Sequence, residues 1–213
     1  MNVRLIAHTP DPDELCAKAA AVCYNARDAR KSLEHALASG HDSVAEHATF
    51  TFLIEGVSRA LLAQLTRHRI ASFSVQSQRY VNQGEKFRYV IPPRIKALGE
   101  AAECHFRFQM EQMGAWYAEW IKVLGGDEAA KEDARFVLPN ACGTHITMTM
   151  NARELRHFFS LRCCNRAQWE IRALADEMLR LCKEAAPMLF ADAGPGCVRG
   201  KCPEKRPCGN PKK

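Results

Sequence analysis

The sequence predicts an α+β domain in which a mostly antiparallel sheet packs against long helices. Two observations lead to this prediction. Short segments alternate apolar and polar residues, as strands with one buried face do, and longer segments carry apolar residues at spacings of three or four, as amphipathic helices do. The 213 residues are enough for one domain with a sizeable core. With no internal repeat and no interdomain linker in view, we predict a single catalytic domain over residues 1–193 and a tail over 194–213.

The elements of the first third of the chain are predicted from their apolar patterns and their end residues. In order, they are a strand at 1–7, helices at 12–23 and 31–39, a strand at 49–55 and a helix at 58–65. The first helix opens with Pro12 and the second ends before Gly40, residues that favour those helix positions. The second strand carries Phe50, Phe52 and Ile54 on one face, so that face should be buried.

The remaining two thirds are predicted to be mainly helical. In order, they contain a strand-like segment at 87–91, one long helix at 94–124, a short helix at 128–136, a strand at 144–150, a helix beginning at Asn151 and a last helix running to about Leu189. We expect the long helix to kink near Gly99 or Gly114. Asn151 and Glu154 resemble a capping box at the next helix start. No Gly-x-Gly-x-x-Gly follows a strand, so a dinucleotide would not bind through a Rossmann turn.

Composition and charge indicate a cytoplasmic protein with an anionic ligand. Hydrophobic residues make up 47% and charged residues 25% of the chain, which is typical of globular proteins. No run approaches the roughly 20 apolar residues that span a bilayer, and the first residues do not resemble a signal peptide. The net charge of +6 suits a nucleotide, a folate or a nucleic acid without choosing among them. Most of the ten cysteines are interpreted as reduced core residues.

Two groups of residues raise the question of a metal. His41 and His47 flank two carboxylates, but their spacing matches no common zinc pattern, so we predict no metal there. Cys197, Cys202 and Cys208 lie in the Gly-, Pro- and Lys-rich tail, where the spacing is not that of a zinc ribbon and only three thiols are present. We predict a mobile tail. The alternative is a zinc site with a fourth ligand elsewhere in the chain.

The most specific pattern in the chain runs from Arg67 to Tyr80. It reads Arg-His-Arg-Ile-Ala-Ser-Phe-Ser-Val-Gln-Ser-Gln-Arg-Tyr. Consecutive residues of a helix or strand point in different directions, so the first three can share one ligand only where the chain bends. From the residues alone, this cluster is either a solvated surface loop or a site for a polyanion such as nucleotide phosphates.

The triplet Arg67-His68-Arg69, seven further residues, Ser77 and the ending Arg79-Tyr80 resemble the signature of the flavin-dependent thymidylate synthases. The resemblance covers four segments in family order, at 40–47, 64–80, 135–139 and 151–172. It implies the family fold and the conversion of dUMP to dTMP. It also implies FAD as cofactor, methylenetetrahydrofolate as one-carbon donor and NADPH as the reductant of the flavin. The implied assembly is a homotetramer with active sites shared between subunits, with neither nucleic acid nor membrane as a partner.

The same resemblance assigns the site residues. The implied FAD contacts are His41, Ser43, Glu46, Arg67, His68, Arg69, Val75, Asn151, Arg153 and His157. The implied dUMP contacts are Gln64, Arg67, Ser77, Gln78, Arg79, Arg135 and Arg162. Arg162 is the implied catalytic residue, because the matching family arginine favours ionisation of ring nitrogen 3 of the pyrimidine. An arginine beside an apolar helix row should also have an acidic or anionic partner.

Several of these residues have simpler readings. Asn151 and Arg153 begin a helix, where Asn151 serves equally as a cap and Arg153 as a solvated side chain. Ser77 is interpreted as a hydrogen-bonding residue and not as a nucleophile, because no His-Asp pair is placed to activate it. The chain has Ser74-Val75 where many relatives have Asn-Glu, so a side-chain carboxylate contact is lost there and backbone contacts remain. His157 and Arg166 replace other polar flavin contacts found in some relatives.

Two other function classes fit part of the sequence. A basic nucleic-acid-binding protein needs only its arginines and cationic tail on one face, but the chain lacks an aromatic-stacking or zinc-finger signature. That reading also leaves the polar segment at 40–47 unexplained. A flavoprotein reductase would keep the flavin contacts and lack a pyrimidine site. Flavin absorption separates the enzymes from the nucleic-acid binder, and dTMP formation separates the synthase from the reductase.

Overall fold

The computed structural model describes residues 1–84 and 87–212, which divide into two compact units. The first unit comprises Met1–Asn2, Glu55–Ala63 and Ser74–Ile146, and the second comprises Val3–Ile54, Gln64–Phe73 and the chain from Thr147 onward. Lys213, the last residue of the predicted tail, lies outside the described residues. The prediction of one domain over 1–193 stays a prediction.

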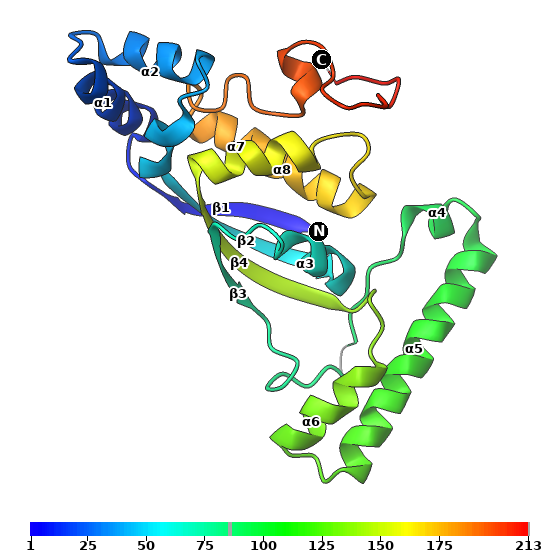
Figure 1. Cartoon of the computed structure of the whole chain (residues 1–213). Helices are drawn as coiled ribbons and strands as arrows, with labels where there is room; N and C mark the ends of the chain where they lie inside the picture. The colour runs from blue at the N-terminus through cyan, green and yellow to red at the C-terminus, as the bar shows by residue number, and fades with distance from the viewer. Residues whose placement is uncertain (85–86, 213) are drawn as a thin grey trace. The chain divides into compact units, whose positions relative to one another are not determined.

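Four strands form one sheet in the order β1–β2–β4–β3 (Figure 1). They are β1 (Asn2–His8), β2 (Thr49–Ser58), β3 (Ala71–Val75) and β4 (Gly143–Asn151). The end of β1 meets the start of β2, where the N–H of Thr9 donates to the carbonyl of Thr49 at 3.0 Å. The hydroxyls of Thr51 and Thr149 lie 2.9 Å apart near the start of β2 and the end of β4. Both pairs are therefore antiparallel, and the predicted α+β class with a mostly antiparallel sheet is confirmed.

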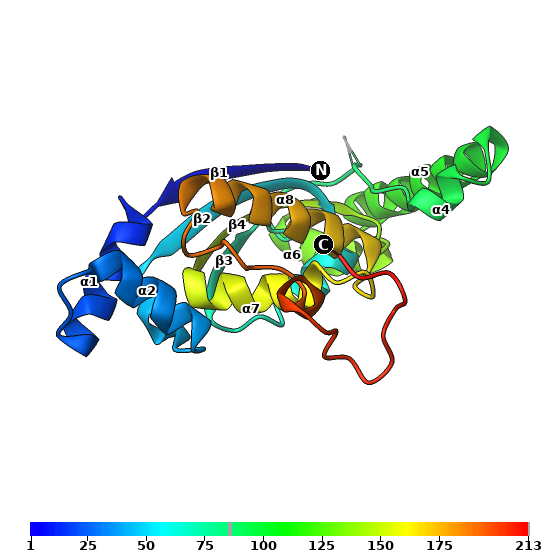
Figure 2. The same cartoon turned by 90° about the horizontal axis from the view of Figure 1, so that it is seen from above.

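The second unit packs helices on its part of the sheet. Its helices are α1 (Pro12–Tyr24), α2 (Ala29–Ala38), α7 (Ala152–Arg162) and α8 (Trp169–Ala185), with 3₁₀ helices η1 (Asp42–His47) and η3 (Gly196–Arg199). Helices α7 and α8 run side by side (Figures 1 and 2). The ring of Phe190, after α8, lies 5.3 Å from that of Phe50 on β2 and 5.9 Å from that of Phe159 on α7. All three are fully buried, so this aromatic cluster joins sheet and helices into one core.

The first unit contains most of the remaining helices. They are α4 (Pro93–Lys96), α5 (Glu100–Val123), α6 (Glu128–Ala134) and the 3₁₀ helix η2 (Arg135–Val137), while α3 (Arg59–Leu65) passes from the first unit into the second. Tyr117 of α5 is buried, and its hydroxyl accepts from the N–H of Gln83 at 3.5 Å. The side chain of Phe87 packs closely against Gly114, where a Cβ would lie 3.4 Å from it. These contacts anchor Gln83 and Phe87 to α5.

The prediction of one long helix at 94–124 is wrong. Two helices, α4 and α5, are separated at Gly99, whose φ of +98° lies in the left-handed region that glycine tolerates. Helix α5 continues through Gly114. The last helix also differs, since α8 ends at Ala185, before the predicted Leu189.

Two strand predictions also need correction. The segment at 87–91 forms only an isolated antiparallel bridge, between Tyr89 and Cys142, because Pro92-Pro93 follows at once and cannot continue a ladder. Conversely, β3 lies inside the 67–80 motif, for which the sequence analysis predicts no strand. Strand β2 runs on through Gly56, whose φ is +69°, to Ser58. Ser58 then caps α3, accepting from the N–H of Leu61 at 3.0 Å.

Across residues 1–84 and 87–212, every helix is too short or too polar to cross a membrane.

Candidate functional site

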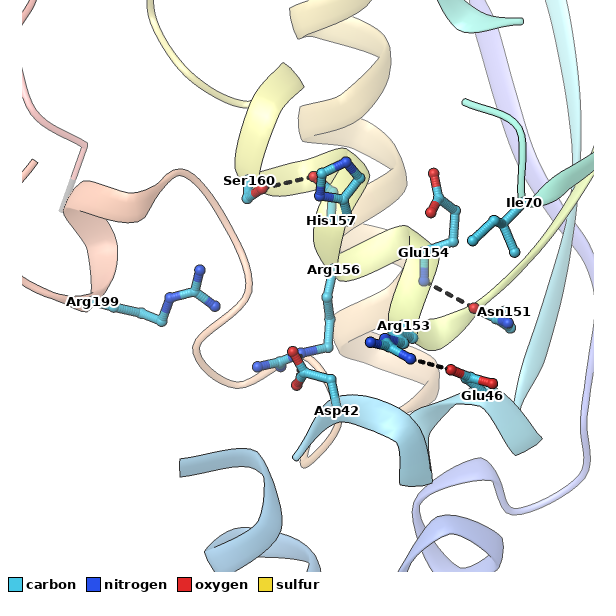
Figure 3. A pocket seen from close by; sticks show the side chains of 10 residues that line it. All are labelled: Asp42, Glu46, Ile70, Asn151, Arg153, Glu154, Arg156, His157, Ser160 and Arg199. Carbon is cyan, nitrogen blue, oxygen red and sulfur yellow. Dashed lines mark hydrogen bonds and ion pairs between the residues drawn. The ribbon is translucent and has the colours of Figure 1, made fainter. Parts of the chain in front are cut away.

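A cavity of about 590 Å³ lies between η1 and α7 in the second unit (Figure 3). It is lined by Asp42, Glu46, Ile70, Asn151, Arg153, Glu154, Arg156, His157, Ser160 and Arg199. Four of these residues, from two distant segments, are predicted flavin contacts: Glu46, Asn151, Arg153 and His157. The structure therefore brings part of the predicted flavin site together around one charged cavity.

The start of α7 lines this cavity with groups that can contact an anion. The side-chain oxygen of Asn151 accepts from the N–H of Glu154 at 2.8 Å, so Asn151 is the N-cap that the sequence predicted. The first turn of a helix presents unpaired N–H groups and the positive end of the helix dipole. Arg153 lies in that turn and forms an ion pair with Glu46 of η1 (Figure 3). A bound anion would therefore replace Glu46 as the partner of Arg153.

Arg156 is a lining residue that the sequence reasoning missed. It is only 5% exposed and donates from Nη1 to the carbonyl of Leu189 at 2.6 Å and to Asp192 at 2.7 Å. Its Nε lies 3.4 Å from a carboxylate oxygen of Asp42. Burial tends to raise the pKa of Asp192, but the hydrogen bond and charge of Arg156 outweigh burial and lower that pKa. An arginine on the apolar side of a helix was the available signal, since it needs carboxylate partners.

A buried chain of polar side chains links the cavity to Arg162. Glu154, which lines the cavity, is 7% exposed, and its Oε1 lies 3.1 Å from Nδ1 of His68, which is 5% exposed. Nε of Arg162 donates to Nε2 of His68 at 3.2 Å. A guanidinium can only donate, so Nε2 must be unprotonated and Nδ1 must carry the proton given to Glu154. We call this arrangement the Glu154–His68–Arg162 chain, and its geometry requires a neutral imidazole.

The electrostatics agree with a neutral His68. Burial lowers its pKa most strongly; the hydrogen bond to Glu154 opposes this, and the positive charge of Arg162 and the nearby His157 lower the pKa further. The ring of Phe158 stands edge-on at 4.9 Å and closes one side of the imidazole. Neutral His68 therefore accepts from Arg162 without repelling it and fixes the direction of the guanidinium.

Two expectations for the triplet change with this geometry. The bend does not aim Arg67, His68 and Arg69 in one direction, because His68 points inward while the two arginines are exposed. The partner found for Arg162 is an imidazole, and the expected carboxylate, Glu154, stands behind it. Both ring nitrogens of His68 contact protein groups, so its predicted contact with flavin stays a prediction. The sequence alone indicates Glu154 only as one of the two residues of a capping box, without a role beside His68.

Three other predicted residues of the second unit do not line the cavity. His41 precedes η1, is exposed, and has its Nδ1 2.8 Å from the hydroxyl of Tyr24. Ser43 is exposed on η1. Gln64 is half-buried near the end of α3, and its carbonyl accepts from the N–H of Arg67 at 3.4 Å. Their assignments stay predictions.

The first unit holds Val75, Ser77 and Gln78, at the end of β3 and just beyond it. Val75 is half-buried. The hydroxyl of Ser77 accepts from the N–H of Arg79 at 3.1 Å, which forms a tight turn, and Gln78 donates to the sulfur of Cys142 at 3.4 Å. Burial raises the pKa of the Cys142 thiol, which argues against a thiolate nucleophile there.

The two predicted nucleotide arginines of this unit both contact α6 or its end. Nε of Arg79 lies 2.9 Å from a carboxylate oxygen of Glu132, and its Nη2 lies 3.6 Å from Glu128. Nε of Arg135 donates to the backbone carbonyl of Glu132 at 3.0 Å. A phosphate bound by Arg79 would therefore take the place of Glu128 and Glu132 as the partner of its guanidinium.

Comparison with known proteins places these residues in context. The profile of the family described as thymidylate synthase complementing protein matches residues 4–188. A flavin-dependent thymidylate synthase of Geobacter sulfurreducens is 51% identical over 217 residues, covering 96% of this chain and 91% of that protein. Proteins of the same description from Nitratidesulfovibrio vulgaris and Pyrococcus abyssi are 50% and 42% identical over 225 residues each, covering 95% and 96% of this chain and 91% and 90% of theirs. The similarity thus spans nearly the whole of each chain.

Proposed function

Because this chain belongs to the thymidylate synthase complementing protein family, we propose that it is a flavin-dependent thymidylate synthase that converts dUMP to dTMP with FAD as cofactor. Methylenetetrahydrofolate is the one-carbon donor and NADPH reduces the flavin in this proposal. The observation that carries the proposal is the charged cavity lined by Glu46, Asn151, Arg153 and His157, joined through Glu154 to a buried chain that ends at Arg162. A nucleic-acid binder has no need of such a buried polar chain.

The residues of the cavity fit an anionic dinucleotide. The capped first turn of α7 and the guanidinium of Arg153 suit a pyrophosphate. Asn151, the N-cap, and His157, one turn after Arg153 along the helix, supply polar contacts. FAD, when bound, supplies the hydride that completes the methyl group. The task of the protein is then to hold, orient and shield the reactants. We assign His41, Ser43, Arg67, Arg69 and Val75 to the same cofactor as further contacts.

Arg162 is the proposed catalytic residue. Reaction at carbon 5 of uracil needs an electron-rich ring, and a guanidinium held against the ring stabilises the negative charge that develops there. His68 takes one N–H of Arg162, at Nε, and leaves the other N–H groups of the guanidinium for the pyrimidine. We propose that His68 acts as a positioning residue, with Glu154 behind it.

We assign the nucleotide to the remaining polar residues and propose the family fold and assembly. The dUMP residues besides Arg162 are Gln64, Arg67, Ser77, Gln78, Arg79 and Arg135. The family resemblance is the basis for proposing a homotetramer in which subunits share active sites.

The test is dTMP formation by the wild type and by Arg162→Ala. Loss of a donor aimed at developing charge costs about 2.7–4 kcal/mol, or roughly 100- to 1000-fold in rate. The matched control is Arg180→Ala on the adjacent helix α8, where the arginine is exposed and pairs with Glu177 and Glu184. Circular dichroism and FAD content confirm folding of both variants.

Three results would contradict the proposal. Normal turnover by a folded Arg162→Ala variant removes Arg162 from the mechanism. NADPH oxidation by the flavin without dTMP formation favours the reductase. Colourless protein that takes up no FAD and binds RNA with a steep salt dependence favours the nucleic-acid binder.

A further inference from the structure

Four cysteines line one cavity of about 280 Å³ in the second unit. Cys197, Cys202 and Cys208 come from the tail, and Cys164 comes from the loop between α7 and α8. The tail alone supplies three thiols, one short of the four ligands that a closed structural zinc site requires. The fold supplies the fourth.

Polar contacts hold the tail against this loop. Asn165 donates to the carbonyl of Asn210 at 2.7 Å, and Arg166 donates to the carbonyl of Arg206 at 2.5 Å. Nζ of Lys212 lies 2.6 Å from a carboxylate oxygen of Asp176 on α8. Exposed contacts of this kind stabilise a segment weakly, and the tail has few apolar side chains to bury. These weak contacts alone do not explain why the tail lies against the loop that carries Cys164, whereas a stronger link between tail and loop would explain it.

The backbone at Asn210 contacts the sulfur of Cys208, whose thiol donates to the carbonyl of Asn210 at 3.3 Å. The N–H of Asn210 lies 3.4 Å from the sulfur of Cys208, across Gly209 at a φ of +76°. Backbone N–H groups that point at sulfur stabilise metal-bound thiolates. Arg166, Lys201 and Lys212 also line the cavity, together with Glu204, which pairs with Arg166 at 3.7 Å. The excess of positive side chains offsets the negative charge that four thiolates leave around a divalent ion.

We propose that Cys164, Cys197, Cys202 and Cys208 bind one Zn²⁺ ion, which ties the tail to the α7–α8 loop. Each thiol loses its proton as its sulfur bonds to the ion. Within residues 1–84 and 87–212, no three His, Cys, Asp or Glu side chains lie close enough to hold an ion as they stand. Zinc–sulfur bonds of about 2.3 Å therefore require the tail to close onto Cys164. Beyond η3 the tail has no regular structure among its described residues, so this movement breaks no helix or strand.

The first test is the metal content of the full-length protein, purified under reducing conditions or loaded with Zn²⁺. We expect about one zinc per chain. Substituting any of the four cysteines by Ser should remove most of it. The controls are Cys23→Ser on α1 and Cys104→Ser on α5, exposed cysteines outside this cavity, which should keep the ion.

The second test uses the wild type alone, so it stands even where a variant fails to fold. The four cysteines should resist alkylation with zinc present and react after chelation, while Cys23 and Cys104 react in both states. A chain that takes up no Zn²⁺, zinc retained in all four variants, iron in place of zinc, or native disulfides among these cysteines would each overturn the proposal. None of these readings depends on thymidylate synthesis.

Discussion

Replacing Glu154 by Gln removes the charge from the Glu154–His68–Arg162 chain and keeps an oxygen that accepts the Nδ1–H of His68. A hydrogen bond to a charged group contributes about 1.5–3 kcal/mol and a neutral one about 0.5–1.5 kcal/mol. If this difference is fully expressed in the orientation of Arg162, Glu154→Gln lowers kcat roughly 5- to 10-fold. Glu154→Ala loses the whole interaction and lowers kcat roughly 10- to 150-fold.

Steady-state kinetics with saturating FAD measure this effect. Arg162 is proposed to act on charge that develops in the transition state, so kcat should fall while the KM for dUMP changes little. A purely structural role for Glu154 would instead lower thermal stability or FAD occupancy in proportion to the loss of activity. A second sign of a positioning role is a higher kcat for Glu154→Gln than for Glu154→Ala.

The matched control is Glu177→Gln on α8, a partly exposed carboxylate paired with Arg180, which should keep the wild-type kcat. A folded, FAD-loaded Glu154→Ala enzyme with wild-type kcat would refute the reasoning. A rise in the KM for dUMP at unchanged kcat would show that the chain contributes only to binding.

Two further predictions concern acid stability and assembly. Burial lowers the pKa of His68 below its ordinary value of 6.5, so the unfolded chain takes up a proton that the folded chain resists. The contribution of neutral His68 to the free energy of unfolding is therefore complete above about pH 6.5. It is lost as the pH falls from there through the folded-state pKa of His68. The Tm of the wild type should therefore drop more between pH 7.5 and 5.5 than that of His68→Gln, and equal drops would contradict this. If subunits share active sites, mixing and reassembling inactive Arg162→Ala and Arg135→Ala chains should restore up to about a quarter of the sites, whereas sites within one chain would stay inactive.

The sequence predicted those fold features that depend on local pattern. The alternation of Phe50, Phe52 and Ile54 marks β2 because one face of the strand is buried along its whole length. Strand β3 was not predicted, because its five residues give too short an alternating pattern and its partner β4 lies far along the chain. The break at Gly99 was foreseen as a kink, but only the left-handed φ separates α4 from α5.

The candidate site divides in the same way. Residues that belong to a local motif were predicted, whereas Glu154 and Arg156 were missed as site residues because tertiary partners define their roles. Glu154 lies 86 residues from His68, and His68 lies 94 residues from Arg162. Periodicity places Glu154 correctly at the start of a helix, yet it cannot show that the carboxylate meets an imidazole. Three tail cysteines were likewise visible in the sequence, and only the fold brings Cys164 to them.

Helix α7 carries the residues of two proposed functions on adjacent stripes. Glu154, Phe158 and Arg162, spaced by four residues, all contact His68. Arg153 and His157, one position earlier on each turn, line the proposed flavin cavity (Figure 3). Because one helix sets both stripes, the direction of Arg162 relative to the cavity is a property of a rigid element and not of a loop. A catalytic guanidinium that must meet a pyrimidine beside a cofactor gains its precision from this helical register.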